Sequence, residues 1–190
     1  MTCTLNRRQD LYMTTVLYFA YGSNLLTNRL VARCPSAHVK DMAAALDWTV
    51  RFTKPGADGS GKAGLFADVG ADHPGIVYEI AAGEMPALDK AEGLGIGYAR
   101  DDNFTVMLSS GEAVTTTTYV PIRHNNALQP FDWYLALCIA GALEHEFDDH
   151  VIETFRSTAC QIDEDHDRKS RIEGIAALKQ AGHSDWRNLL

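Results

Sequence analysis

Val16-Leu17-Tyr18-Phe19-Ala20-Tyr21-Gly22-Ser23-Asn24-Leu25 is an apolar, aromatic run that stops abruptly at Gly-Ser-Asn. The run is rich in strand-forming residues, and the pattern from Leu25 to Cys34 predicts a helix. Gly22 permits a sharp turn between them, and Ser23 or Asn24 can cap the helix. Such a junction directs several backbone N–H groups, with the positive end of the helix behind them, toward one point. It can hold a carboxylate, a phosphate or a developing oxyanion. The alternative is an ordinary connection between two elements.

A second informative stretch, Ala87-Leu88-Asp89-Lys90-Ala91-Glu92-Gly93-Leu94-Gly95-Ile96-Gly97-Tyr98, lies further along the chain. A short helix is expected to begin near Met85-Pro86 and to end at Gly93. Glu92 is then the last helical residue, where its carboxylate faces the negative end of the helix dipole. It is either a surface side chain beside a flexible turn, or a partly buried carboxylate with a raised pKa that accepts a proton near neutrality.

The order of the remaining elements is strands first and helices last. Alternating or β-branched patterns predict strands over 44–54, 65–69, 75–81, 103–109 and 113–122. Helical patterns follow over 131–146, 148–159 and 163–181. In the first of these helices, Tyr134, Cys138, Gly141 and Ala142 share one face, and the two small residues allow close approach to the strands. Short strands with Gly-rich corners predict an α+β fold, a small mixed β-barrel with helices packed around it.

We expect three parts in the chain: an N-terminal extension over 1–14, a catalytic domain over 15–160 and a C-terminal helical tail over 161–190. Arg7-Arg8 and the apolar residues that follow could imitate a secretory leader. Against this, the apolar run leads straight into the Gly-Ser-Asn turn without a small-x-small cleavage site, and Met13 is an alternative start. No segment approaches the ~20 apolar residues of a membrane span. The tail is either a peripheral helix or partly ordered.

The composition excludes some partners. With 190 residues and a formal net charge of −8, the chain offers no Lys/Arg stripe to displace counterions from nucleic acid. Cys3, Cys34, Cys138 and Cys160 show no Cys-x-x-Cys spacing, which favours reduced thiols in a cytoplasmic protein.

Three other patterns are weighed as sites and set aside. Residues 56–63 nearly match a phosphate-binding P-loop, but Ala63 stands where Ser or Thr must hold magnesium, so a solvated hairpin tip is the better interpretation. The acidic and histidine residues of 144–150 and 163–167 occupy consecutive polar positions, which is typical of solvated charge runs and does not favour a metal site. The other histidines are scattered, and a hydrolytic triad is not supported.

The two leading segments together resemble the gamma-glutamylcyclotransferase family, an AIG2-like superfamily. Tyr18 to Leu25 matches the segment that opens the family's domain, and Leu88 to Gly93 matches the segment that supplies its catalytic glutamate. The resemblance extends over residues 16–145 and includes further matches at Leu26-Thr27, Arg29, Cys34-Pro35-Ser36-Ala37, Gly75-Ile76-Val77-Tyr78 and Tyr134.

The resemblance implies a gamma-glutamyl cyclotransferase-like fold and an enzyme of glutathione metabolism. Such an enzyme cyclises a small-molecule gamma-glutamyl amide to 5-oxoproline and releases an amino acid or amine. It implies Glu92 as the general acid/base and requires no cofactor or metal. Implied substrate-binding residues are Tyr18, Phe19, Ala20, Tyr21, Gly22, Ser23, Asn24, Leu25, Tyr98 and Tyr134. A homodimer is compatible with this interpretation.

Two departures from the family pattern leave alternatives open. Leu94 to Gly97 has its own length, which weakens the assignment of Tyr98, and no motif beyond Ala142 is matched. The leaving group could therefore be an amino acid, the Cys-Gly part of glutathione, a polyamine or a protected natural product. Rival functions are a related gamma-glutamylamine or biosynthetic deprotection cyclotransferase, and a non-catalytic small-ligand binding module.

Overall fold

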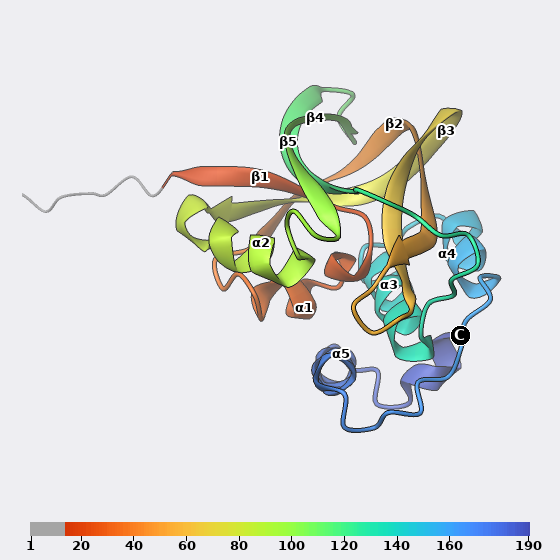
Figure 1. Ribbon diagram of the computed structural model, residues 1–190. Coiled ribbons are helices and arrows are strands. Elements are labelled where there is room, and N and C mark those ends of the chain that lie inside the picture. Colours follow the sequence, from red (N-terminus) through yellow and green to blue (C-terminus); the bar gives the residue numbers. More distant parts are fainter. Residues whose placement is uncertain (1–13) are drawn as a thin grey trace, which may run out of the picture.

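Five strands close into a barrel in the order β1-β3-β2-β4-β5 in a computed structural model that describes residues 14–190 (Figure 1). The strands are β1 (Thr15–Ala20), β2 (His38–Pro55), β3 (Gly61–Ala81), β4 (Tyr98–Leu108) and β5 (Ala113–Pro121). Neighbouring strands are antiparallel except β1 and β5, which are parallel where Tyr18 faces Thr117. The predicted mixed barrel is confirmed. The predicted extension over 1–14, the leader interpretation and Met13 lie outside the described residues, Thr14 excepted.

The strands predicted over 65–69 and 75–81 are one continuous strand, β3, so their separation was wrong. The residues between them resemble a loop, but they pair with β2 and remain in the sheet. Gly70 takes a positive φ of 84° and Asp47 one of 62°, and the Gly70 N–H donates to Asp47 Oδ1 at 2.8 Å. The register of the pairing shifts between Leu46 and Trp48, and this irregularity absorbs the bend.

The helix predicted from Leu25 to Cys34 is two shorter pieces. A 3-10 turn, η1 (Ser23–Leu25), is followed by the five-residue helix α1 (Thr27–Val31). Neither has a side-chain cap, so the predicted capping by Ser23 or Asn24 was wrong. Both side chains are engaged elsewhere: Ser23 Oγ accepts from Arg29 Nε, and Asn24 bonds to three other side chains.

The helix α2 (Met85–Glu92) follows a short turn, η2 (Ala82–Glu84), and has the predicted bounds. Pro86 stands in its first turn, as expected for a residue without an N–H. Gly93 ends the helix with a left-handed φ of 68°, a conformation that glycine adopts without a Cβ penalty. Glu92 is therefore held at a sharply defined helix end.

The three later helices are α3 (Asp132–Glu144), α4 (Asp149–Arg156) and α5 (Lys169–Gln180). Helix α3 is buried over residues 132–142. A Cβ on Gly141 would lie 2.5 Å from Leu25 Cβ and 2.5 Å from Leu26 N. The close approach predicted for this face is therefore made to η1 and not to the barrel strands themselves.

The C-terminal segment 161–190 packs against the helical layer, with α5 below α1 and α3 in Figure 1. Trp186 and Leu189 of the 3-10 turn η3 (Trp186–Leu189) are buried. Trp133 Nε1 donates to Asp163 Oδ2 at 2.9 Å, which fixes the start of the segment. The segment therefore has the form of a peripheral helix packed on the helical layer. Among residues 14–190, no helix is long and apolar enough to cross a bilayer.

One histidine joins the barrel to α4. His73 of β3 packs its ring on Phe155, with ring centroids 6.1 Å apart. Its Nε2 is buried and has no hydrogen-bond partner within residues 14–190. Burial lowers the pKa of His73 to about 4.

Candidate active site

The carboxylate of Glu92 lies against the turn that follows β1. Glu92 Oε1 accepts a hydrogen bond from Asn24 Nδ2 at 2.9 Å and another from Arg33 Nη1 at 2.8 Å. Its side chain is 15% exposed, so the geometry matches the partly buried interpretation and not the surface one. No hydrogen bond to Glu92 Oε2 is formed within residues 14–190. One carboxylate oxygen is thus fixed and the other is open.

Asn24 connects the groups around this carboxylate. Its side-chain nitrogen also donates to Tyr18 Oη at 2.9 Å, and its Oδ1 accepts from Arg33 Nη1 at 2.8 Å. Asn24 is buried. Because buried polar groups need partners, these bonds fix its orientation and, through it, that of Glu92.

The turn at Gly22, Ser23 and Asn24 presents its backbone to the same place. Their N–H groups make no hydrogen bond within the described residues, whereas the next one, Leu25 N–H, donates to Gly22 O at 2.9 Å. A Cβ on Gly22 would lie 2.8 Å from Ala63 Cβ, so this approach requires glycine. The helix-dipole support expected here is missing, because α1 begins only at Thr27 and has five residues.

Five buried tyrosines line the recess, Tyr18, Tyr21, Tyr98, Tyr119 and Tyr134. Tyr98 Oη donates to Ala63 O at 2.6 Å, and Tyr134 Oη accepts from Ala63 N at 3.2 Å. Burial raises the pKa of Tyr18, Tyr21, Tyr98 and Tyr134, which keeps their hydroxyls protonated near neutrality. The Tyr134 hydroxyl contacts Ala63 N–H and the Ser23 side chain, which places it at the edge of the recess.

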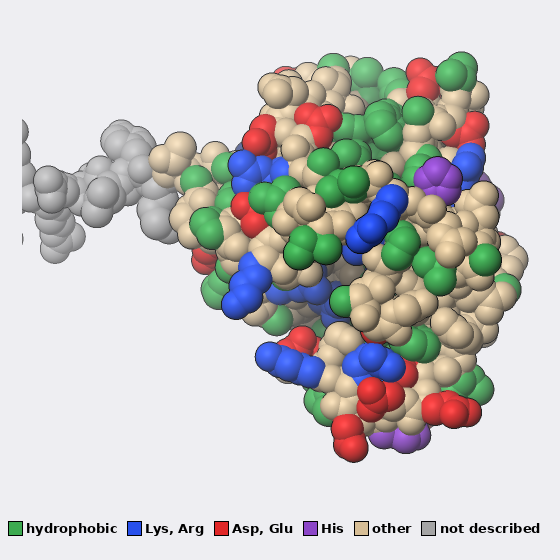
Figure 2. Space-filling model, in the orientation of Figure 1, with side chains coloured by type: hydrophobic (Ala, Val, Ile, Leu, Met, Phe, Trp, Pro, Cys, Tyr) green, Lys and Arg blue, Asp and Glu red, His purple; other side chains and the backbone are tan. Residues whose placement is uncertain are grey.

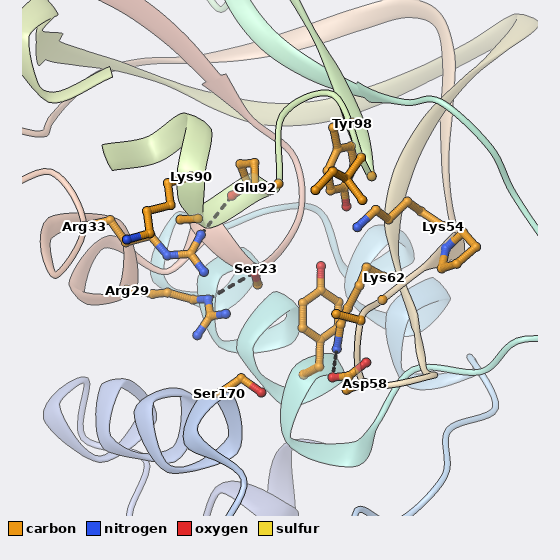
Figure 3. A pocket seen from close by; sticks show the side chains of 18 of the residues that line it. Ser23, Arg29, Arg33, Lys54, Asp58, Lys62, Lys90, Glu92, Tyr98 and Ser170 are labelled. Atoms are coloured by element: carbon orange, nitrogen blue, oxygen red, sulfur yellow. Dashed lines mark hydrogen bonds and ion pairs between the residues drawn. The ribbon is translucent and has the colours of Figure 1, made fainter. Parts of the chain in front are cut away.

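Two connected spaces adjoin Glu92. An inner recess of about 20 Å³ is lined by Tyr18, Tyr21, Gly22, Ser23, Asn24, Ala63, Glu92, Tyr98, Tyr119 and Tyr134. It opens on an outer cavity of about 470 Å³, which shares Ser23, Glu92, Tyr98 and Tyr134 with it (Figure 3). The structure thus brings together eight of the eleven residues expected at the site.

Phe19, Ala20 and Leu25, expected to bind substrate, line neither space. All three are fully buried in the core. Phe19 stacks on Phe104 with ring centroids 5.9 Å apart. They support the site by packing, and we do not assign them a contact with a ligand.

Sequence reasoning assigned no site role to the basic side chains of the outer cavity: Arg29, Arg33, Lys54, Lys62, Lys90 and Arg123. Arg29 and Arg33 are four residues apart, which is the spacing of neighbours on a helical surface and could have signalled them. The hairpin predicted at 56–63 is present, but its tip is not simply solvated. Lys62 Nζ and Asp58 Oδ2 form a 2.7 Å ion pair at 14% and 11% exposure and line the cavity.

Most members of the charged clusters weighed as metal sites are exposed, and the two that are not, His145 and Asp163, are engaged within the fold. His145 Nε2 lies 2.9 Å from Leu25 O, and Arg168 Nε donates to Asp163 Oδ2 at 2.8 Å. Residues 14–190 contain no group of three or more His, Cys, Asp or Glu side chains placed to share a metal ion.

The fold and this site define a barrel with a polar pocket at one end, and the AIG2-like family model matches residues 74–154. A Bos taurus gamma-glutamylcyclotransferase is 32% identical over 134 residues, covering 68% of this chain and 71% of the relative. The Homo sapiens gamma-glutamylcyclotransferase is 31% identical over the same shares. This chain belongs to the gamma-glutamylcyclotransferase family and is an enzyme of that family.

Solved structures agree with this assignment. A crystal structure of an uncharacterized protein from Homo sapiens superposes with a TM-score of 0.71 at 27% identity, covering 79% of this chain and 94% of that one. A structure described as gamma-glutamyl cyclotransferase has a TM-score of 0.77 at 24% identity, covering 87% and 99%, and shows the shared fold.

Proposed function

We propose that the protein cyclises a gamma-glutamyl amide to 5-oxoproline and releases the amine, with Glu92 as the general acid and base. One observation carries the proposal: the Glu92 carboxylate and the open N–H groups of Gly22, Ser23 and Asn24 line the same recess. The names of the relatives support the substrate class.

The reaction needs one proton acceptor. The substrate's own α-amine attacks its γ-carbonyl carbon, the ring C–N bond forms and the amide C–N bond breaks. Because the nucleophile is already tethered, orientation replaces a covalent enzyme intermediate. An α-ammonium group has a pKa of about 8, so a carboxylate can accept its proton once the group is held in place. The attacking nitrogen gives up a second proton as the ring closes, and the departing nitrogen takes up both protons and leaves as an ammonium group.

Each group around Glu92 has a separate role in the proposed reaction. Asn24 and Arg33 hold Oε1, which leaves Oε2 to exchange the proton with the substrate. The N–H groups of Gly22 to Asn24 hold either the glutamyl α-carboxylate or the oxyanion on the γ-carbonyl. The hydroxyl of Tyr134 lies at the edge of the recess, and the leaving group extends into the outer cavity.

The test is Glu92→Gln, assayed by mass spectrometry for 5-oxoproline over a panel of gamma-glutamyl amino acids, peptides and amines. We expect turnover to fall by about 100- to 10,000-fold, as for loss of a general base, while ligand binding persists. Glu112→Gln, at an exposed position in the turn between β4 and β5, is the matched control and should retain activity.

Each rival function predicts a different result. Wild-type-like turnover by Glu92→Gln would refute the role of Glu92. Turnover confined to gamma-glutamylamines would indicate the related cyclotransferase activity. Binding without 5-oxoproline formation by the wild type would indicate a binding module.

A further inference from the structure

We propose that the amine released by this enzyme carries at least two negative charges, which bind a basic wall of the outer cavity. The basic wall consists of Arg29, Lys54, Lys62, Lys90 and Arg123. The inference rests on the proposed function, because it places the leaving group of a gamma-glutamyl amide in this cavity.

The charge of the cavity is opposite to that of the chain. Six basic side chains line it against two acidic ones, Asp58 and Glu92, although the chain has a formal net charge of −8. Figure 2 shows Lys and Arg side chains along the edges of the hollow between the barrel end and α5. A cleft lined by one sign of charge focuses the field and raises the local concentration of counter-charged ligands.

Most of these cations have no counterion among the residues that the structure describes. Lys62 pairs with Asp58, but the other four members of the basic wall form no salt bridge within residues 14–190. Two of these four are deeply placed: Arg29 is 9% exposed and Lys54 7%. Because a buried charge without a partner is costly, this arrangement calls for an external anion.

The contacts of these two side chains leave room for such an anion. Arg29 bonds to Ser23 Oγ through Nε alone, at 3.1 Å. Lys54 Nζ lies 4.2 Å from the centroid of the Tyr98 ring. Burial lowers the pKa of Lys54, and it lowers that of Arg29 to about 10, so the Arg29 guanidinium stays cationic near neutrality. Figure 3 shows Arg29 on one side of the cavity and Lys54 on the other.

The β2–β3 hairpin also carries positive charge that the described residues do not fully neutralise. Lys54 and Lys62 are direct partners across the β2–β3 ladder, where like charges destabilise each other. Asp58 neutralises only one of them. A leaving group with one carboxylate would leave either Arg29 or Lys54 without a partner, because the two lie on opposite sides of the cavity. A dicarboxylate or a phosphorylated amine can meet both, and the cavity of about 470 Å³ has the space for it.

The experiment compares gamma-glutamyl-glutamate with gamma-glutamyl-glutamine, which match in size and differ by one charge. We expect kcat/KM to favour the glutamate compound by about tenfold at low salt, the effect of one charge-assisted contact, and this preference to shrink as ionic strength rises. A second pair, gamma-glutamyl-phosphoserine and gamma-glutamyl-serine, distinguishes a phosphate from a second carboxylate as the preferred anion.

Variants locate the preference. Lys54→Gln should reduce the ratio of kcat/KM for the glutamate and glutamine compounds to within about threefold. Lys54→Arg should keep the ratio, because arginine retains the positive charge. Lys179→Gln, at an exposed position of α5 away from the cavity, is the control and should leave the ratio unchanged. Thermal unfolding of each variant separates loss of charge from loss of fold.

The outcomes separate this inference from the proposed function. Equal turnover of charged and neutral partners in both pairs would overturn the inference and leave the cyclotransferase activity standing. An unchanged ratio in folded Lys54→Gln would also overturn it. If no gamma-glutamyl compound yields 5-oxoproline, the proposed function fails and the inference fails with it.

Discussion

Replacing Asn24 by alanine is expected to slow the proposed cyclisation without unfolding the protein. The variant removes three hydrogen bonds: those to Tyr18 Oη and Glu92 Oε1, and the one from Arg33 Nη1. Glu92 keeps its bond to Arg33, so the carboxylate remains in the recess but loses one of the two contacts that orient it.

The magnitude follows from the bond to the carboxylate. A hydrogen bond to a charged group contributes about 1.5–3 kcal/mol. If that contribution is realised mainly in the transition state, kcat falls by about 10- to 100-fold. This loss is smaller than that expected for Glu92→Gln, because the proton acceptor is still present. Tyr18 and Arg33 lose partners too, so the free energy of unfolding should fall by about 1–3 kcal/mol.

The assay is 5-oxoproline formation under saturating substrate, combined with urea unfolding of each variant. Asn188→Ala, at an exposed position in η3, is the matched control. Asn24→Ala and Arg33→Gln act on the same oxygen, so the double variant should show a non-additive loss. Wild-type kcat in a folded Asn24→Ala variant would refute the idea that this amide orients Glu92. Strict additivity with Arg33→Gln would refute their shared role.

Two further predictions concern stability. The pKa of His73 is about 4 in the folded protein and 6.5 in the unfolded chain. At a pH between these values the unfolded chain binds a proton at His73 that the folded protein does not, so lowering the pH favours unfolding. The free energy of unfolding should fall by about 2 kcal/mol from about pH 8 to about pH 5. In urea titrations, His73→Leu should lack this pH-dependent loss. Curves of unfolding free energy against pH that run parallel for the wild type and the variant would contradict the prediction. Gly141→Ala should cost about 1–3 kcal/mol because its Cβ would clash with Leu26 N, whereas Gly83→Ala, whose Cβ meets open space, should be nearly neutral in the same unfolding assay. Equal stability of the two glycine variants would contradict the tight contact.

Local patterns were sufficient for much of the fold. The barrel strands and α2 were predictable because apolar alternation and the Pro86 and Gly93 signals act within a few residues. The continuity of β3 was not, because Gly70 to Pro74 resembles a loop until pairing with β2 is known. Similarly, Asn24 was expected to cap a helix, but distant partners engage its side chain instead.

The site divides in the same way. Family motifs pointed to Glu92 and to the turn at Gly22, and the structure places them in one recess. The basic wall could not be predicted, because its members come from α1, α2, the β2–β3 hairpin and the segment after β5. Only the barrel closure brings these elements to one end. Arg33 was predictable only in part. Its spacing from Arg29 could be read from the sequence, but its ion pair with Glu92 could not.

Ser170 of α5 lines part of the outer cavity, whereas the hydrogen-bond partners of Glu92 are Asn24 in η1 and Arg33 just after α1. The surroundings of the Glu92 carboxylate thus come from residues near the start of the chain, whereas the C-terminal segment adds only Ser170 to the residues that line the outer cavity. A substitution at Ser170 can therefore change the shape of the outer cavity without removing either hydrogen-bond partner of Glu92.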